Sequence, residues 1–281
     1  MIKKVTALCL LLALLFSAMS AKAAPDSYEG YQIPIDLSVN GSFIKCSQKP
    51  FLLNGTTYIP LRAFSDAIGA ELIWNDAEQS ATVLKDGHTL VFYANENRSI
   101  LDGYEGPELA THYGLLFVPI RAICDTLGYT IEWDGFYYVV NITAPNVTVP
   151  ESAKDYAYSY EDLLYLAKIT HVECGAEPFR TRIGIANTVV NRVRSPLYPN
   201  NIKDAIYDTK HGVQYPPAHT DKMNVTPSVS SMLAAKCALN GVELVGDSVA
   251  FVNINNLASS WAHNNMQHYV TLGVVAFYRF P

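Results

Sequence analysis

Apolar and polar positions follow one pattern in the first half of the chain and another in the second. In the first half, short runs rich in β-branched and aromatic residues alternate with turn residues, as at 71–74 (ELIW) and 80–84 (SATVL), and predict strands. In the second half, apolar residues recur at helical spacing, as they do from Ile183 to Val193. The chain is therefore predicted to be α+β, with a β-rich first part and a mainly helical second part.

The β-rich part contains an internal repeat. The segment 58–76 (YIPLRAFSDAIGAELIWND) aligns with 117–135 (FVPIRAICDTLGYTIEWDG) at a constant offset of 59 residues. The identities shared by the two segments are Pro60/Pro119, Arg62/Arg121, Ala63/Ala122, Asp66/Asp125, Gly69/Gly128 and Trp74/Trp133. So many identities at one offset indicate a duplicated unit.

Each copy is predicted to be a β-α-β-β unit. A strand reaches the shared proline, a helix begins near Leu61 or Ile120, and Gly69 or Gly128 closes it in the left-handed region. The strands that follow are expected at 71–74 and 80–84 in the first copy and at 129–133 and 137–142 in the second. We expect the copies to pack face to face. The Arg and Asp of each helix, four residues apart, are interpreted as structural salt bridges.

The repeat resembles the copper amine oxidase N-terminal-like domain, through the string PLRAFSDAIGAEL followed by Trp74. The resemblance covers about residues 30–143 and implies a targeting or interaction module of secreted bacterial proteins, with an unknown partner. It implies neither copper nor oxidation, because the module is not the copper-bearing part of that oxidase. Residues 144–158, rich in Pro, Ser and Ala, are predicted to be a linker.

Composition and charge narrow the classes of function. The chain of 281 residues is 49% hydrophobic and 16% charged, which permits a full core, and its net charge of −6 argues against nucleic-acid binding. Two lysines, an apolar run at 8–18 and the motif Ala21-Lys22-Ala23 predict a signal peptide over residues 1–23. The apolar run is too short to span a membrane. The mature protein is therefore expected to be secreted and not membrane-spanning.

Four cysteines follow the predicted cleavage point, namely Cys46, Cys124, Cys174 and Cys237. Their spacings match no metal-binding pattern. Export permits disulfides without requiring them, so two outcomes stay open. Either the bridges Cys46–Cys124 and Cys174–Cys237 form, or the thiols stay free.

The helical part is predicted to begin with a capping-box-like start at Ser159 and to continue as a helix to Gly175. Glu173 then lies in the last turn of this helix, and Glu177 lies just beyond it. Further elements are predicted at 181–193 (helix), 226–240 (helix, with Thr226 as its N-cap), 248–254 (strand) and 269–278 (strand).

Residues 163–208 (LLYLAKITHVECGAEPFRTRIGIANTVVNRVRSPLYPNNIKDAIYD) resemble the start of the SleB-type, or spore-cortex-lytic, cell wall hydrolases. The match continues through 214–217, Trp261 and 272–278, so it covers about residues 160–279. It implies a lysozyme- or transglycosylase-like catalytic domain over residues 159–281 that cleaves the glycan backbone of peptidoglycan. It implies no cofactor and no metal, and it associates the protein with the cell wall or the spore cortex and germination. By position, the essential glutamate of that family is Glu173.

The position of Glu173 suits an acid that protonates a glycosidic oxygen. The carbonyl end of a helix disfavours a carboxylate, and apolar neighbours would raise the pKa further by desolvation. We therefore expect a raised pKa for Glu173 and a lytic transglycosylase in which this residue serves first as acid and then as base. Glu177 is the candidate second acid. The candidates for substrate contact are Glu177, Gln214, Tyr215 and Trp261.

The chain departs from the family at two places. The family's G-E-P is here Ala176-Glu177-Pro178, and its terminal I-G-N-H is Leu272-Gly273-Val274-Val275. The contacts that the missing Asn and His supply are expected from His263 or His268. Asn191 and Arg192, at the end of a helix, are interpreted as structural residues that bond to neighbouring loops.

Two other functions stay open. A zinc amidase or peptidase acting on stem peptides could draw its ligands from a set without any recognised spacing, namely His211, His219, Asp221, His263 and His268. A non-catalytic wall-binding protein is favoured by the missing Asn and His and disfavoured by the retained Glu173.

Overall fold

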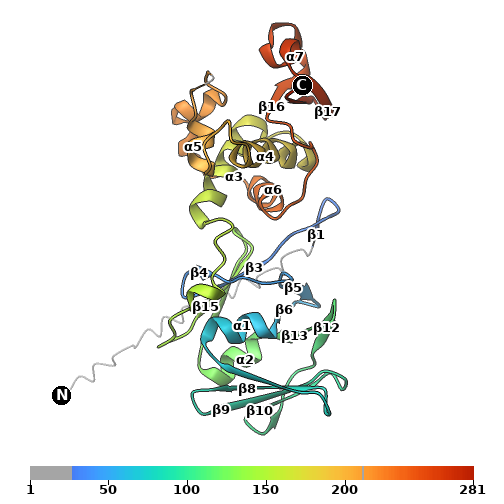
Figure 1. Ribbon diagram of the computed structural model, residues 1–281, viewed down its shortest axis with the longest axis vertical. Helices are drawn as coiled ribbons and strands as arrows, with labels where there is room; N and C mark the ends of the chain where they lie inside the picture. The colour runs from blue at the N-terminus through green and yellow to red at the C-terminus, as the bar shows by residue number, and fades with distance from the viewer. Residues whose placement is uncertain (1–26, 211) are drawn as a thin grey trace, which may run out of the picture.

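The computed structural model describes residues 27–210 and 212–281. The predicted signal peptide lies outside the described residues. Within them the chain is α+β, as expected, with a β-rich domain (elements β1 to β15) and a helical domain (elements α3 to β18). Figure 1 shows the two domains stacked along the long axis of the molecule, with β3 and β15 between them.

The two copies of the repeat have the same local structure. In each, a strand runs into a proline, a helix of eight residues follows, and a glycine with a φ of 63° or 69° ends the helix. Glycine adopts this left-handed conformation at no steric cost. The first copy comprises β6 (Thr56–Pro60), α1 (Leu61–Ile68), β7 (Glu71–Asn75) and β8 (Ser80–Lys85). The second comprises β13 (Leu115–Pro119), α2 (Ile120–Leu127), β14 (Thr130–Asp134) and β15 (Val139–Thr143).

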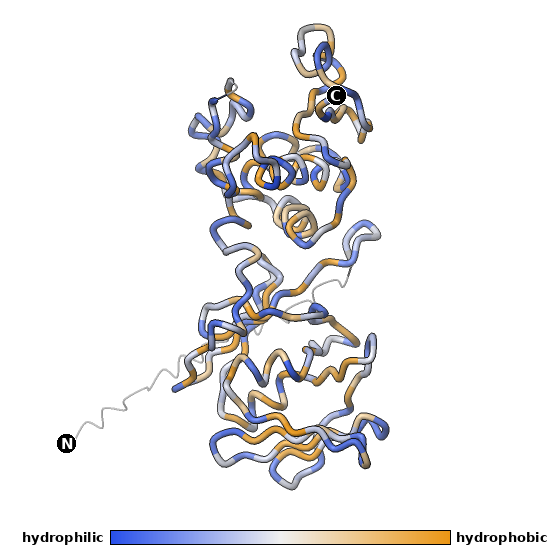
Figure 2. The backbone as a smooth tube through the Cα atoms, viewed as in Figure 1, coloured by the Kyte–Doolittle hydropathy of each residue, from blue (hydrophilic) through white to orange (hydrophobic). Residues whose placement is uncertain are grey.

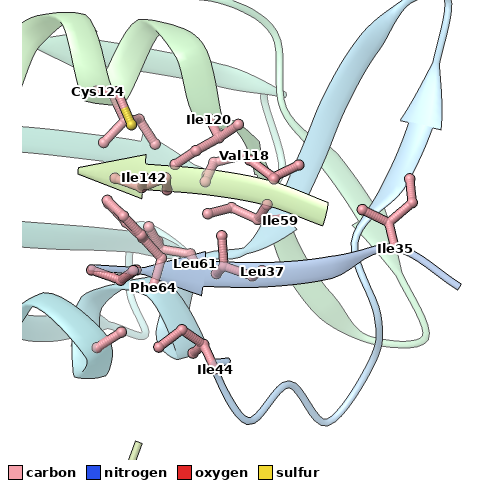
Figure 3. Packing of buried hydrophobic residues seen from close by; sticks show 14 of the residues in the cluster. Ile35, Leu37, Ile44, Ile59, Leu61, Phe64, Val118, Ile120, Cys124 and Ile142 are labelled. Atoms are coloured by element: carbon pink, nitrogen blue, oxygen red, sulfur yellow. The ribbon is translucent and has the colours of Figure 1, made fainter. Parts of the chain in front are cut away.

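The two copies meet at a pair of equivalent strands. β6 and β13 run antiparallel at the centre of a four-stranded sheet, between β5 (Phe51–Leu53) and β12 (Ala110–His112). Ile59 of β6 lies opposite Val118 of β13, the residue that corresponds to it at the offset of 59. An approximate two-fold axis therefore passes through this pair. Figure 3 shows both side chains in the apolar cluster of the domain, beside Ile120 at the start of α2.

Outside these shared elements the copies have different neighbours. β8 lies in an antiparallel sheet of five strands ordered β11-β10-β9-β8-β7. β15 instead pairs in parallel with β3, in a sheet ordered β14-β15-β3-β4. The strands not yet placed are β3 (Asp36–Val39), β4 (Ser42–Phe43), β9 (His88–Tyr93), β10 (Arg98–Leu101) and β11 (Tyr104–Glu105), together with the hairpin of β1 (Ser27–Tyr28) and β2 (Tyr31–Gln32).

The salt bridges expected within the two repeat helices are absent. Arg62, Asp66, Arg121 and Asp125 are all exposed, and no ion pair joins them within the part of the chain that the structure describes. An exposed pair of this kind gains little free energy over two hydrated charges. The four cysteines of the described chain form no disulfide bridges, because all of them are free thiols.

Three helices form the body of the helical domain, namely α3 (Tyr160–Cys174), α4 (Phe179–Arg194) and α6 (Val229–Leu239). The start of α3 is confirmed, since Ser159 and Asp162 form a complete capping box. The predicted cap of α6 is wrong. Its N-cap is Ser228, whose side chain accepts a hydrogen bond from the backbone N–H of Ser231, and Thr226 lies outside the helix. A serine two residues further on supplies the same cap within reach of the third helical residue.

The C-terminal apolar run predicted as one strand is a hairpin. Gly273, with a φ of 59°, turns the chain between β17 (Gln267–Leu272) and β18 (Val275–Arg279). β16 (Ala250–Asn253) pairs with the other edge of β18. The short elements that the sequence did not predict are η1 (Glu151–Ala153), α5 (Ile202–Tyr207), η2 (Pro216–His219), η3 (Asp221–Asn224), η4 (Ile254–Ser259) and α7 (Trp261–Asn265).

The segment between the domains is packed against both of them. Val149 and Ala153 are buried in the core of the β-rich domain, and Tyr158 is buried in the core of the helical domain. The predicted linker at 144–158 is therefore an ordered segment that contacts both domains. Figure 2 shows the hydrophobic stretches concentrated along the strands of the lower sheet, with polar stretches at its turns. No helix in residues 27–210 and 212–281 has the length and apolar character needed to cross a membrane.

A buried ion pair joins the two domains. Lys236 of α6 donates a hydrogen bond of 2.5 Å to Asp36 of β3 and another of 2.8 Å to the backbone carbonyl of Tyr137. Asp36 also accepts hydrogen bonds from Tyr158 and Lys49, at 2.5 and 2.8 Å. Burial alone would raise the pKa of Asp36, but the two lysines lower it. Burial also pulls the pKa of Lys236 down, yet the three donors around Asp36 favour the ionised pair.

Candidate active site

Glu173 lies in the last turn of α3, which packs on α4 and α6 within the helical domain. The carboxyl oxygen Oε1 of Glu173 is buried, and no described residue forms a hydrogen bond with it. Buried polar atoms in folded proteins nearly always have such a partner. A carboxyl group held without one is therefore a candidate for chemistry rather than for structure.

Burial raises the pKa of Glu173 to about 7, and Lys222 of η3 opposes this rise only in part. Removal from water disfavours the charged form of a carboxyl group. The direction agrees with the raised pKa expected from the helix end and apolar neighbours. Near neutral pH a large fraction of Glu173 is therefore protonated and able to donate a proton.

Arg182 fixes the turn that follows Glu173. Its guanidinium group donates hydrogen bonds of 2.8 Å to the backbone carbonyls of Gly175 and Glu177. Gly175 leaves no space for a larger residue, because an added Cβ would lie 2.6 Å from the carbonyl oxygen of His171. The end of α3 is therefore held in one position. The sequence reasoning missed Arg182, since no local pattern marks an arginine that bonds back to the preceding turn.

Glu177 lies in the turn between α3 and α4 and is half-buried against the β17–β18 hairpin. A Cβ placed on Gly273 would lie 2.9 Å from the carboxyl oxygen Oε2 of Glu177. Gly273 is thus suited to its position both by its positive φ and by this close approach. The hairpin turn and the end of α3 are brought together by the fold, although they lie far apart in the sequence.

Arg192 holds Gln214 in place. The guanidinium carbon of Arg192 lies 5.1 Å from the ring centroid of Tyr198 and 4.7 Å from that of Tyr215. The same group donates to Oε1 of Gln214 at 2.8 Å and to the carbonyl of Val249 at 2.7 Å. These contacts match the structural role expected for Arg192, and they orient the Gln214 amide.

Asn191 matches its expected role as well. Its side-chain amide donates to the carbonyls of Gly246 and Ser248, at 2.7 and 2.9 Å. The end of α4 is thereby tied to the loop that leads into the C-terminal sheet.

The two aromatic candidates lie in opposite environments. Tyr215 is fully buried, and its hydroxyl lies 3.1 Å from that of Thr188. This burial argues against the expected contact between Tyr215 and a sugar, because no ring face reaches solvent. Trp261, the first residue of α7, has 68% of its surface exposed and is therefore free to contact a ligand.

His263 and His268 both lie beside Tyr278 of β18. Nδ1 of His263 is 3.0 Å from the Tyr278 hydroxyl, and Nε2 of His268 is 2.9 Å from the Thr271 hydroxyl. Their ring centroids lie 6.0 and 5.6 Å from that of Tyr278. His211 lies outside the described residues. In residues 27–210 and 212–281, no three His, Cys, Asp or Glu side chains gather as a metal site would require, so the zinc hypothesis gains no support.

Comparison with known protein families assigns both domains. Residues 176–278 match the family described as Cell Wall Hydrolase. This part of the chain is therefore similar to cell wall hydrolase domains. Residues 38–112 match the copper amine oxidase N-terminal domain. Both matches agree with the resemblances seen in the sequence. The hydrolase match begins at Ala176, three residues after Glu173, so it includes Glu177 and does not include Glu173.

Curated proteins named spore cortex-lytic enzymes are similar to part of the chain. One from Halalkalibacterium halodurans is 24% identical over 110 residues, which is 39% of this chain and 32% of that protein. One from Bacillus cereus is 24% identical over 104 residues, which is 37% of this chain and 39% of that protein. The chain thus spans about a third to two fifths of the length of these curated relatives.

Solved structures of related catalytic domains also resemble the chain. The catalytic domain of the Bacillus cereus SleB protein is 22% identical, with a TM-score of 0.40, and the match covers 43% of this chain and 92% of that one. The catalytic domain of the germination-specific lytic transglycosylase SleB from Bacillus anthracis has the same identity and TM-score, with coverage of 47% and 100%.

Proposed function

We propose that this protein degrades peptidoglycan by cleaving its glycan backbone, as a lytic transglycosylase with Glu173 as its acid and base. The observation that carries the proposal is the carboxyl group of Glu173, whose Oε1 atom is buried without a hydrogen-bond partner in the described chain and whose pKa is raised to about 7. The family match of the hydrolase domain and the names of its relatives support the choice of peptidoglycan as substrate.

The raised pKa suits the first step of the reaction. A glycosidic oxygen is a poor leaving group until it is protonated, so the acid must still carry its proton near neutral pH. In the proposed step, the Glu173 proton passes to the bridging oxygen as the bond from that oxygen to C1 of the muramyl sugar breaks. The chain beyond this oxygen leaves as an alcohol, and Glu173 becomes a carboxylate.

The second step restores Glu173. The C6 hydroxyl of the muramyl sugar attacks C1 and loses its proton to the Glu173 carboxylate, which closes a 1,6-anhydro ring. This route needs one carboxyl group, whereas a retaining or inverting hydrolase needs two at defined separations. Glu177, held against the β17–β18 hairpin, is the residue we would assign as second carboxyl if water attacks instead.

Two other residues are proposed to contact the substrate, and a third helps to position one of them. Gln214, whose amide is held by Arg192 and by the carbonyl of Gly212, is assigned to the N-acetyl group of a sugar. Trp261 offers an exposed ring face for stacking. Tyr215 has an indirect role, because its buried ring packs against the Arg192 guanidinium that orients Gln214. We place the reaction outside the cell, at the wall or the spore cortex, in keeping with the predicted signal peptide.

Mass spectrometry of the fragments released from purified peptidoglycan tests the proposal. The mature protein is expected to release anhydromuramyl fragments, at a rate that falls as the pH rises through about 7 because Glu173 loses its proton. Glu173→Gln should lose this activity by about a thousandfold or more, the scale expected when the acid of a proton transfer is removed. Glu161→Gln is the matched control, because Glu161 is exposed in the first turn of the same helix.

Other products would change the proposal in defined ways. Reducing-end sugars would keep the glycan target and replace the transglycosylase by a hydrolase that uses water. Free stem peptides, lost on chelation, would instead support the zinc amidase. Binding to peptidoglycan without soluble fragments would support the non-catalytic wall-binding protein.

A further inference from the structure

The two repeat copies differ at one turn, and the difference leaves a groove open in the first copy. In copy one the turn after β7 reads Asn75 to Gln79 (NDAEQ), and in copy two the turn after β14 reads Asp134 to Tyr138 (DGFYY). The turns have the same backbone design. Oδ1 of Asn75 accepts hydrogen bonds from the two backbone N–H groups at 77 and 78, and Oδ1 of Asp134 accepts from those at 136 and 137.

In copy two, the turn is filled with aromatic residues. The ring of Tyr138 packs edge-on against Trp133, with centroids 5.3 Å apart, and Tyr138 is only 3% exposed. Tyr137 packs against Tyr160, and its carbonyl accepts the hydrogen bond from Lys236. This turn therefore forms part of the contact between the two domains.

In copy one, the equivalent residues are polar and leave the tryptophan uncovered. Gln79 stands where copy two has Tyr138, with the same left-handed backbone, at φ values of 49° and 53°. Trp74 is 43% exposed, and its indole N–H is fixed by a hydrogen bond of 2.7 Å to Asp76. The indole is thus held in one orientation, with almost half of the residue's surface exposed to solvent.

Trp74 lines a groove of about 680 Å³, which we call the Trp74 groove. Its lining combines apolar with polar and charged side chains, and the residues that matter here are Arg62, Asp66, Leu72, Trp74, Gln79 and Asn95. Ligand sites of this size commonly pair an apolar lining with a few polar groups that set orientation. Lys45, Arg62 and Asp66 are its charged residues, so the groove carries one net positive charge on a chain of net charge −6.

We propose that the Trp74 groove binds the glycan strand of peptidoglycan as a second site, separate from the one that contains Glu173. A pyranose ring can stack on the indole, the amides of Gln79 and Asn95 suit N-acetyl and hydroxyl groups, and the positive charge suits a strand that carries acidic stem peptides. The inference rests on the proposed function, because it takes the ligand to be the polymer that the hydrolase domain cleaves. Two sites on one strand would raise the effective concentration of the enzyme at an insoluble wall.

Sedimentation with purified Gram-positive peptidoglycan, stripped of teichoic acids, measures this binding. All variants carry Glu173→Gln, so that the polymer is not consumed during the measurement. Trp74→Ala should weaken binding by about tenfold or more, the effect of removing a tryptophan anchor from a binding groove. Gln79→Tyr, which installs the residue of copy two, should weaken it as well by covering the indole. Ile73→Ala is the matched control, because Ile73 is 46% exposed on the same strand and does not line the groove.

The outcomes separate this inference from the proposed function. If Trp74→Ala and Gln79→Tyr bind as tightly as Ile73→Ala, the inference is wrong, whatever the cleavage assay gives. If binding depends on Trp74 but the unmodified protein releases no glycan fragments, the inference stands and the proposed function fails. Glycan strands freed of their stem peptides should compete for the groove, and competition by the released stem peptides alone would overturn the choice of ligand. Melting temperatures of the three variants check that each one folds.

Discussion

Asp36 and Glu173 both have carboxyl oxygens that are removed from water, and they differ in the partners around them. Asp36, between the two domains, accepts hydrogen bonds from Lys49, Lys236 and Tyr158. Glu173, at the end of α3, has a buried oxygen without a partner in the described chain. Burial by itself would raise the pKa of either group. The lysines lower the pKa of Asp36 instead, whereas the pKa of Glu173 stays raised, at about 7.

The presence or absence of hydrogen-bond donors therefore gives two carboxyl groups of the same protein different properties. A buried carboxylate with three donors stays ionised and links β3 to α6 at the domain junction, where removing one partner alone would leave the other charge buried and unpaired. A buried carboxyl without donors favours its protonated form, so it can donate a proton to a ligand at neutral pH. Changing either residue should therefore affect a different property of the protein.

The largest effect on stability is expected when the buried pair is broken. Asp36→Leu leaves the ammonium group of Lys236 buried with only the Tyr137 carbonyl as a partner. We expect a loss of about 3–5 kcal/mol in the free energy of unfolding, the usual cost of isolating one charge of a buried pair. Urea denaturation of the mature protein measures this loss.

Two further variants sharpen this prediction. Adding Lys236→Met to Asp36→Leu should recover much of the loss, because no isolated charge remains. Glu161→Leu breaks the exposed pair with Lys203 and should leave the free energy of unfolding nearly unchanged. Equal losses in Asp36→Leu and Glu161→Leu would contradict the role given to the junction.

A smaller effect, with a characteristic pH dependence, is expected at Glu173. A pKa of about 7 in the fold, against an ordinary value of 4.5, means that the folded state binds the proton more tightly than the unfolded state. The stability that this gives is complete below pH 4.5 and is lost as the pH rises through about 7, by up to about 3 kcal/mol. Relative to Glu173→Gln, the unmodified protein should therefore lose stability between these two pH values.

Unfolding free energies of the two proteins at pH 4.5 and pH 8 measure this difference. The sign is opposite to that expected for Asp36, whose lowered pKa gives stability that is lost as the pH falls. A stability difference between Glu173→Gln and the parent that does not change with pH would show that Glu173 has no raised pKa.

The smallest effect concerns the thiols beside the two carboxyl regions. Cys174 follows Glu173, and Cys237 follows Lys236, so a bridge between them would link both regions. The structure keeps both as buried free thiols, and burial raises the pKa of each to about 12. We expect dithiothreitol to change the melting temperature by less than about 1 °C, since there is no disulfide constraint to remove. A clear fall in melting temperature under reducing conditions would contradict this expectation.

The elements that the sequence predicted well are marked by local signals. Pro60 and Gly69 delimit α1, and Ser159 caps α3, because caps and left-handed glycines act within a few residues. The raised pKa of Glu173 could also be predicted, because the carbonyl end of a helix disfavours a carboxylate and apolar neighbours limit its solvation. The strands of both copies follow from short runs rich in β-branched and aromatic residues that are bounded by turn residues.

The features that the sequence did not predict depend on distant contacts. Nothing near Asp36 indicates that Lys236, 200 residues away, will neutralise it. The burial of Tyr215 and the exposure of Trp261 are set by packing, which the composition around each ring does not reveal. The cap at Ser228 was missed because Thr226 followed by proline gives an equally good local signal.

The parallel pairing of β3 with β15 has a consequence for the order in which the chain folds. Asp36 of β3 lies beside Val139 of β15, which is made about 100 residues later, and loop closure over such a distance is slow. During vectorial synthesis, β3 can therefore pair with β15 only after both repeat copies have been made. β3 therefore reaches its final pairing with β15 late, although it is made first. Its contact with Lys236 can form only when most of the helical domain has also been made.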